Sequence, residues 1–158
     1  MPKGIKIMPT IQPSETDKAY AAGFIDGEGC VSVRISQVNV KRGWSPSCYA
    51  SVTVSQTDYN KASLDWLSAR WGGAVRKMAP PKRQEWAQGY EWCIVSQMFY
   101  TFMDDVLPHL IVKREAAENA MRIREIRSGR WHALGEEELA MHREIAAESK
   151  RLNQRRGV

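Results

Sequence analysis

The most constraining feature of this sequence is segment 19–30, which reads AYAAGFIDGEGC. Residues spaced i, i+3, i+4, i+7 and i+8 share one face of a helix. In this segment that face consists of Ala19, Ala22, Gly23, Asp26 and Gly27. An interior glycine costs a helix about 1 kcal/mol relative to alanine, and two glycines four residues apart are typical of a helix that another backbone approaches closely. The segment therefore predicts a helix that packs against a second protein helix.

The same helix carries two acids, Asp26 and Glu28, at its expected C-terminal end. The helix macrodipole disfavours negative charge there. An arrangement that breaks a local rule in this way marks a candidate functional site.

Length and composition exclude several classes of protein. A chain of 158 residues, 43% of them hydrophobic, is expected to form one domain with a real core. No run reaches the roughly 18 apolar residues of a membrane span, and residues 1–12 lack the apolar segment of a secretory signal. The three cysteines show no paired spacing, which argues against a zinc site or a disulfide framework. We therefore expect no membrane partner and a reducing, intracellular compartment, either the cytoplasm of a bacterium or phage host or an organelle.

The charge of the chain is a weak indication of nucleic-acid binding. The net charge is +5 and the pI is near 9.2, values that basic proteins of every function share. Two basic clusters stand out: Arg76, Lys77, Lys82 and Arg83 in one, and Lys150, Arg151, Arg155 and Arg156 in the other. The second cluster fits equally well with cations that stabilise a helix C-terminus.

The hydrophobic pattern predicts alternating helices and hairpins. A helix is expected from a cap at Ser14 or Thr16 to about Gly27. A hairpin, a helix over 58–71 ended by two glycines, and a second hairpin over 74–95 follow. Three further helices are expected over 97–107, 113–127 and 136–152. In the first hairpin, Val31, Val33 and Ile35 alternate with Ser32, Arg34 and Ser36, so one face is apolar and the other is polar and basic.

Three segments together resemble the LAGLIDADG homing endonucleases. Residues 21–29 (AAGFIDGEG) resemble the family signature, with departures at Ala21, Phe24, Gly27 and Glu28. Ser55-Gln56-Thr57 falls where the second strand meets the next helix, and LPHL at 107–110 followed by KREAA at 113–117 resembles the family's proline-then-lysine segment. The resemblance covers about residues 17–127. It implies an α+β protein with the αββαββα homing-endonuclease fold, an antiparallel DNA-binding sheet and an extra C-terminal helix.

The resemblance also implies a division of the chain and an activity. We expect a flexible arm over 1–13, an endonuclease domain over 14–128 and a C-terminal helical extension over 129–158, which could brace the core, cap a dimer or touch flanking DNA. The implied activity is site-specific hydrolysis of double-stranded DNA at a long pseudo-palindromic site. Because the motif occurs once, the resemblance implies a homodimer in which each chain supplies half of the active site.

Carried over by position, the resemblance implies roles for individual residues. Glu28 would bind Mg²⁺ together with the backbone carbonyl of Gly27, and Mn²⁺ or Ca²⁺ could substitute in binding. Gln56 would orient water, and Lys113 would neutralise the reacting phosphate. Asp26 is expected to hold helix ends or the interface rather than the metal. A further basic position of the family falls at Asn60 or Lys61, so its role stays open.

Contacts with DNA and with a second copy are expected at two surfaces. The DNA-contacting set is Ser32, Arg34, Ser36, Lys41, Arg42, Tyr49, Ser51, Thr53, Arg76, Lys77, Lys82 and Arg83. Arginines suit guanine edges, and the loop lysines and arginines suit phosphates. Arg76 or Lys77, with Tyr90 or Trp92, would extend this face onto the second hairpin. The expected dimer interface is Ala19, Ala22, Gly23, Asp26 and Gly27.

Two other functions remain compatible with this sequence. An RNA maturase that helps an intron to splice could use the same basic sheet. A non-catalytic DNA-binding regulator could use the same scaffold. The joint presence of Glu28, Gln56 and Lys113 favours the nuclease, because binding alone requires none of them.

Overall fold

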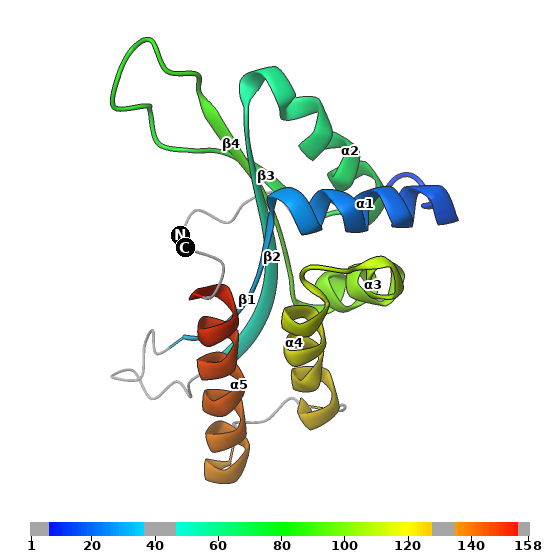
Figure 1. Cartoon of the computed structure of the whole chain (residues 1–158), viewed down its shortest axis with the longest axis vertical. Coiled ribbons are helices and arrows are strands. Elements are labelled where there is room, and N and C mark those ends of the chain that lie inside the picture. Colours follow the sequence, from blue (N-terminus) through cyan, green and yellow to red (C-terminus); the bar gives the residue numbers. More distant parts are fainter. Residues whose placement is uncertain (1–6, 37–46, 128–134, 155–158) are drawn as a thin grey trace.

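A computed structural model describes residues 7–36, 47–127 and 135–154 of the chain. Helices pack on a four-stranded antiparallel sheet (Figure 1). The elements are α1 (Glu15–Glu28), β1 (Gly29–Ser36), β2 (Ser47–Thr57), the short 3-10 helix η2 (Asp58–Asn60), α2 (Lys61–Trp71), β3 (Ala74–Lys77), β4 (Gly89–Val95), α3 (Ser96–Val106), the 3-10 helix η3 (Leu107–His109), α4 (Arg114–Arg127) and α5 (Glu136–Gln154). The predicted order of helices and hairpins, with an extra C-terminal helix, is confirmed.

The first helix begins with a capping box. The Asp17 amide donates to Oγ of Ser14 at 3.1 Å, and the Ser14 amide donates back to the Asp17 carboxylate at 3.0 Å. These two bonds satisfy amides that the first turn of a helix leaves without partners. Of the two predicted caps, Ser14 is therefore the one used.

The strands lie in the order β1-β2-β4-β3. In this register Gly29 faces Val54, and Val31 faces Val52. Helices α1 to α4 cover one face of the sheet (Figure 1). Val31, Val33, Ala50, Val52 and Val54 are buried on that face, as their alternation predicted.

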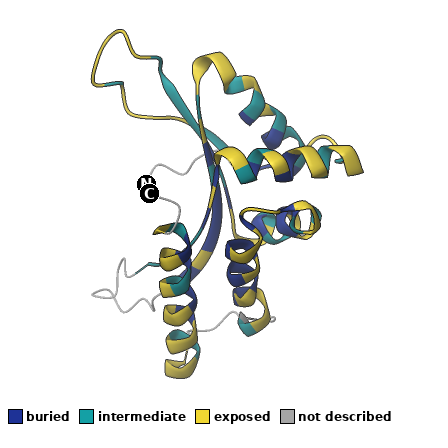
Figure 2. Cartoon of the chain, in the orientation of Figure 1, coloured by how far each residue is buried: buried dark blue, intermediate teal, exposed yellow. Residues whose placement is uncertain are grey.

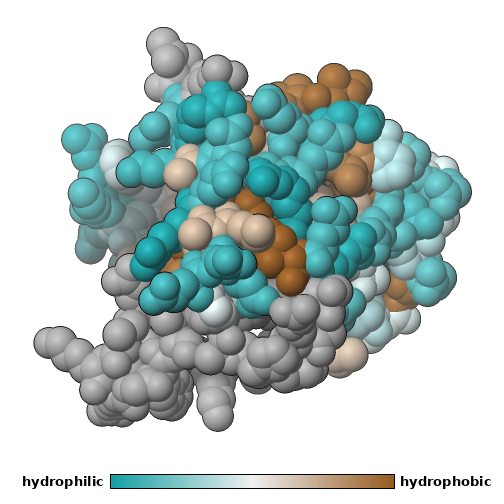
Figure 3. Space-filling view, turned by 90° about the horizontal axis from the view of Figure 1, so that it is seen from below, coloured by the Kyte–Doolittle hydropathy of each residue, from teal (hydrophilic) through white to brown (hydrophobic). Residues whose placement is uncertain are grey.

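The core lies between the sheet and the helices, as the burial colours show (Figure 2). Trp92, Phe99 and Phe102 are fully buried in it. The indole nitrogen of Trp92 donates to the Gly72 carbonyl at 2.9 Å, so the polar atom of this large ring is satisfied. The end of the molecule seen from below is mainly hydrophilic, with hydrophobic residues in small groups (Figure 3).

Two glycines make the sharp turn from α2 into β3. Gly72 has a φ of +79° and Gly73 a φ of +89°, which side chains disfavour. A Cβ on Gly73 would also lie 2.7 Å from the Cys93 carbonyl oxygen. The predicted helix end at these glycines is confirmed.

Other segments contact the sheet at both of its sides. The Ile7 amide donates to the Gly73 carbonyl at 3.2 Å at the β3 side. Helix α5 runs along β1 at the opposite edge and packs against α4 (Figure 1). Among the described residues, no helix has the length and apolar character needed to cross a membrane.

Candidate active site and nucleic-acid interface

The end of α1 presents its last turn to solvent. Gly27 and Glu28 are exposed there, directly before β1 begins. Gly23 and Gly27 face open space, because a Cβ added to either would meet no atom within 4 Å. The two glycines therefore leave a bare helix surface that nothing in the described chain covers.

The predicted interface face needs one correction. Ala19, Gly23 and Gly27 are exposed, as an interface requires. Ala22 is instead fully buried, so its side chain belongs to the core of the same chain. Because α1 packs on the sheet through Ala21, Ala22 and Ile25, the bare strip is narrower than the sequence spacing predicted.

Asp26 links the end of α1 to the start of α4. Its carboxylate accepts hydrogen bonds from the Ile111 and Lys113 amides, both at 2.8 Å. Burial acts to raise the pKa of Asp26, but amide bonds from Ile111, Lys113 and Val112 and the charge of Lys113 outweigh it, so the pKa lies below its ordinary value. The expectation that Asp26 holds helix ends is met, and its carboxylate serves its own chain.

Lys113 is bound to the same turn from the other side. Its ammonium donates to the Ile25 carbonyl at 2.7 Å and to the Asp26 carbonyl at 3.0 Å, and the residue is only 9% exposed. These carbonyls lie at the C-terminus of α1, where a positive charge is favourable, and the Ile25 carbonyl also accepts from the Gly29 amide. Lys113 therefore stabilises the turn that presents Gly27 and Glu28.

A cleft of about 400 Å³ opens beside this turn. Its walls come from the end of α1, the start of β1, the start of α4 and Asn153 of α5. Gly27 and Lys113 both line it, so the end of α1 and a fixed cation share one recess.

Gln56 is half-buried at the end of β2 and faces the helices. It lies two residues beyond Val54, the partner of Gly29, and therefore about 7 Å further along the strand, beside the junction of α1 and β1. Its side-chain oxygen accepts a hydrogen bond from the Asn60 amide at 3.4 Å. Asn60 and Lys61 are the two candidates for the family's further basic position. Asn60 has no charge, and Lys61 pairs with Asp65 at 2.8 Å, so neither residue provides an unpaired cation there.

A single chain offers only part of a metal site. Within residues 7–36, 47–127 and 135–154 no group of three or more His, Cys, Asp or Glu side chains is gathered. Glu28 supplies one exposed carboxylate and Gly27 an adjacent carbonyl oxygen. Mg²⁺ prefers such hard oxygen ligands and is typically bound by one or two carboxylates together with water and substrate phosphates. These donors therefore fit a Mg²⁺ ion that also takes ligands from water and substrate phosphates, and they do not form a complete site from protein ligands alone.

The open face of the sheet carries the predicted polar side chains of the first hairpin. Arg34 is exposed, and its partner Tyr49 is 36% exposed. Ser51 lies on this face but is only 6% exposed, with its hydroxyl 3.1 Å from that of Ser32. The prediction that Ser51 is available for DNA is therefore wrong for the free chain, since its position on a central strand shields it.

The second hairpin divides the predicted residues between the two faces. Arg76 pairs with Glu91 on the open face, at 3.2 Å between their charged groups. Lys77 pairs with Tyr90, which shares its face with the fully buried Trp92. Of the two alternatives for extending the open face, Arg76 therefore lies on it and Lys77 does not, and neither aromatic residue extends that face. Sequence reasoning also missed the acid at Glu91.

The loop between β3 and β4 projects beyond the sheet (Figure 1). Lys82 and Arg83 are exposed on it, as phosphate contacts require. The Arg83 guanidinium lies 5.4 Å from the ring centre of Trp86, which is 54% exposed. The predicted contacts Lys41 and Arg42 lie outside the described residues.

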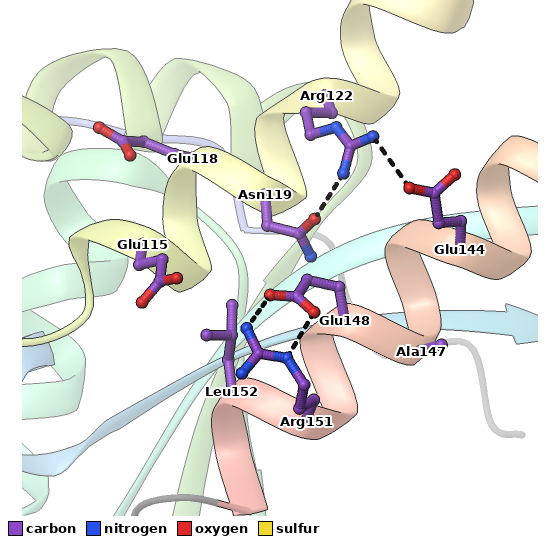
Figure 4. Close-up of a pocket in the computed structure, with 9 residues that line it drawn as sticks. All are labelled: Glu115, Glu118, Asn119, Arg122, Glu144, Ala147, Glu148, Arg151 and Leu152. Carbon is purple, nitrogen blue, oxygen red and sulfur yellow. Dashed lines mark hydrogen bonds and ion pairs between the residues drawn. The ribbon is translucent and has the colours of Figure 1, made fainter.

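A larger cleft of about 610 Å³ lies between α4 and α5 (Figure 4). An ion pair crosses it, from Arg122 of α4 to Glu144 of α5 at 3.8 Å. The bond from Arg122 to Asn119 at 3.2 Å lies within α4, and the Arg151–Glu148 pair lies within α5. The buried Asn119 amide in turn donates to the Ile145 carbonyl at 3.0 Å. We therefore interpret this cleft as part of the contact between α4 and α5.

Two residues near the candidate site were missed from sequence. Ser149 and Asn153 of α5 bond to the backbone of β1, and Asn153 also lines the small cleft. Their four-residue spacing places them on one helix face, but that spacing gives no sign of which strand they meet.

Comparisons with known proteins agree with this architecture. The homing endonuclease I-CvuI, in complex with its target in the presence of 2 mM Ca, superimposes with a TM-score of 0.70 and 23% identity over 87% of this chain and 82% of that chain. The archaeal intron-encoded homing endonuclease I-Vdi141I, complexed with DNA, superimposes with a TM-score of 0.69 and 19% identity over 87% of this chain and 84% of that chain. The I-LtrWI LAGLIDADG homing endonuclease, bound to target DNA, superimposes with a TM-score of 0.66 and 20% identity over 89% of this chain and 46% of that chain. No protein-family model and no curated protein matches the chain.

These structures share one fold with the chain. The chain has the fold of the LAGLIDADG homing endonucleases, so the resemblance drawn from three sequence segments is confirmed at the level of the fold.

Proposed function

We propose that the chain is a site-specific, metal-dependent DNA endonuclease that acts as a homodimer and hydrolyses phosphodiester bonds in both strands of a long pseudo-palindromic site. One observation carries the proposal. The exposed acid Glu28 and the Gly27 carbonyl end a helix whose bare glycine strip has no partner within the described chain. A regulator that only bound DNA would require no such exposed acid.

The bare strip supports the homodimer. Two α1 helices that meet through Ala19, Gly23 and Gly27 would approach closely, because glycine leaves no side chain between the backbones. A two-fold axis through this contact would bring the two Glu28 residues together. The superposition covers 82% of the I-CvuI chain but only 46% of the I-LtrWI chain. These coverages agree with the proposal that one copy of this chain forms one half of a complete enzyme.

Glu28 and the Gly27 carbonyl would hold Mg²⁺, with Mn²⁺ or Ca²⁺ able to substitute in binding. Bound there, the ion would supply Lewis-acid stabilisation of the charge that develops on the phosphate oxygens. The proposed Ca²⁺ substitution agrees with the Ca²⁺ present with I-CvuI and its target.

The remaining roles follow from position. Gln56, which lies on β2 two residues beyond the partner of Gly29, orients water in the proposed site. Lys113 places a fixed positive charge in the cleft beside Gly27. This charge acts on the reacting phosphate through the field of a partly desolvated site, even while its hydrogen bonds hold the helix end.

The open face of the sheet would read the DNA. Four residues of the predicted set lie on this face with their side chains at least partly exposed: Arg34, Tyr49, Thr53 and Arg76. The two arginines suit the guanine edge. Lys82 and Arg83 on the β3–β4 loop, with Lys41 and Arg42, would contact phosphates. We place the enzyme in a reducing compartment, the cytoplasm of a bacterium or phage host or an organelle, in keeping with three cysteines that show no paired spacing.

The test is digestion of a randomised or intron-insertion-site DNA library with Mg²⁺, comparing the wild type with Glu28→Gln. We expect both proteins to bind the selected site and only the wild type to cut both strands. A wild type that binds DNA tightly without cutting it would refute the nuclease. If that protein accelerated the splicing of an intron RNA, it would be a maturase, and if it did not, a DNA-binding regulator.

A further inference from the structure

Helix α5 bonds through two side chains to backbone groups on the free edge of β1. The Val33 amide donates to Oγ of Ser149 at 3.0 Å, and the Asn153 side-chain amide donates to the Val31 carbonyl at 3.0 Å. An edge strand presents a row of unpaired amides and carbonyls that must otherwise find water or another chain. These two bonds tie α5 to β1 in a defined register.

The spacing of the two contacts explains why the register is unique. Ser149 and Asn153 stand about 6 Å apart along the helix, and Val31 and Val33 stand about 7 Å apart along the strand. The order of the contacts is reversed, so α5 runs antiparallel to β1. A shift of α5 by one turn would break both bonds.

The two side chains differ in their surroundings. Ser149 is 2% exposed and is not one of the residues that line the small cleft. Asn153 is half-buried and forms part of that cleft, together with Gly27 and Lys113. Its carbonyl partner Val31 follows Glu28 by only three residues. The Asn153 amide therefore acts on the first residues of β1, three residues beyond the end of α1.

We propose that Asn153 is a positioning residue of the proposed active site, which fixes the start of β1 and through it the orientation of Gly27 and Glu28. This inference rests on the proposed endonuclease function. It makes the C-terminal extension a support of the catalytic centre in addition to a brace for the sheet. A displacement of about 1 Å at reacting groups is enough to slow catalysis strongly, so one amide at this junction has a measurable effect.

The experiment compares Asn153→Ala and Asn153→Gln with Ser149→Ala as the matched control in full-length protein. Cleavage is measured on the selected DNA site at saturating DNA and Mg²⁺, and DNA affinity is measured in Ca²⁺. Asn153→Ala is expected to lower kcat by about tenfold or more with a small change in affinity. Asn153→Gln retains an amide donor and is expected to recover part of the rate. Ser149→Ala is expected to lower the melting temperature while the folded protein keeps its kcat.

A second readout needs neither metal nor DNA. Hydrogen exchange of the amides of residues 28–31 is expected to accelerate in Asn153→Ala and to stay near the wild-type rate in Asn153→Gln. Unchanged exchange in Asn153→Ala, or a kcat within about twofold of the wild type, would overturn the inference. An equal loss of kcat in Ser149→Ala would overturn it too, since it would mean a general loss of structure. A wild type that cuts no DNA would refute the endonuclease itself, which is a separate outcome.

Discussion

Asp26 and Lys113 each bind the helix end to which the other belongs. The Asp26 carboxylate accepts from the Lys113 amide at 2.8 Å at the start of α4, and the Lys113 ammonium donates to the Asp26 carbonyl at 3.0 Å at the end of α1. Each charge stands where the helix dipole favours it, the anion at an N-terminus and the cation at a C-terminus. The two residues thereby fix the turn that presents Gly27 and Glu28.

Replacement of Asp26 by Asn is expected to destabilise the chain in a manner that depends on pH. The loss of a capping anion should lower the free energy of unfolding by about 1–2 kcal/mol near pH 7. Because the pKa of Asp26 is lower in the folded than in the unfolded chain, its contribution is complete above the unfolded value and disappears as pH falls through the folded value. The difference between wild type and Asp26→Asn in urea denaturation should therefore shrink below about pH 4.

A matched control uses the exposed Asp65, which pairs with Lys61 one helical turn away. Asp65→Asn should change stability by less than about 0.5 kcal/mol, because exposed ion pairs contribute little. An effect of Asp26→Asn as small as that of Asp65→Asn would contradict the assigned role.

The reciprocal contact also predicts energetic coupling between Asp26 and Lys113. Lys113→Met removes the ammonium donor from the Ile25 and Asp26 carbonyls. Within the described residues only the Ile25 carbonyl keeps another donor, the Gly29 amide. We therefore expect a loss of about 1–3 kcal/mol. The double variant with Asp26→Asn should depart from the sum of the single effects by at least about 0.5 kcal/mol, as expected for residues in one network. Strict additivity in denaturant unfolding would show that the two contacts act independently.

Local patterns predicted the parts of this structure that depend on neighbours in sequence. Alternation placed Val31 and Val33 on the buried face because strand geometry has a period of two, and Gly72 ended a helix because glycine tolerates positive φ. The width of the buried face of a helix depends on what packs against it and not on neighbours in sequence. Helical spacing therefore grouped Ala22 with Gly23, although only the alanine is buried.

The contacts that build the candidate site are long-range. Lys113 meets the Ile25 carbonyl across 88 residues of sequence, and Asn153 meets Val31 across 122. Periodicity contains no information on such pairs. The position of Lys113 was predicted from a family pattern, whereas its bonds to the end of α1 became visible only in the fold.

Replacement of Gly23 by Leu is expected to abolish dimerisation without unfolding the chain. A Cβ at this position meets no atom of the same chain within 4 Å, and leucine favours helix more than glycine does. The circular dichroism spectrum and melting curve of the variant should thus indicate a folded protein, while analytical ultracentrifugation should find a monomer. Gly135→Ala is the control, since its Cβ also meets open space but far from α1 in sequence. A Gly23→Leu protein that remained dimeric would exclude the α1 strip as the interface.

Replacement of Glu91 by Gln is expected to tighten DNA binding. Glu91 is the acid that pairs with Arg76 on the open face of the sheet, at 3.2 Å. The change releases the Arg76 guanidinium for DNA and removes a negative charge that repels phosphates, so affinity in Ca²⁺ should rise severalfold at low salt and less at high salt. Glu118→Gln makes the same change of net charge on α4, beside the larger cleft and not on the sheet, and should leave affinity nearly unchanged. Equal effects of the two variants would mean that total charge, and not the open face, determines how the protein holds DNA.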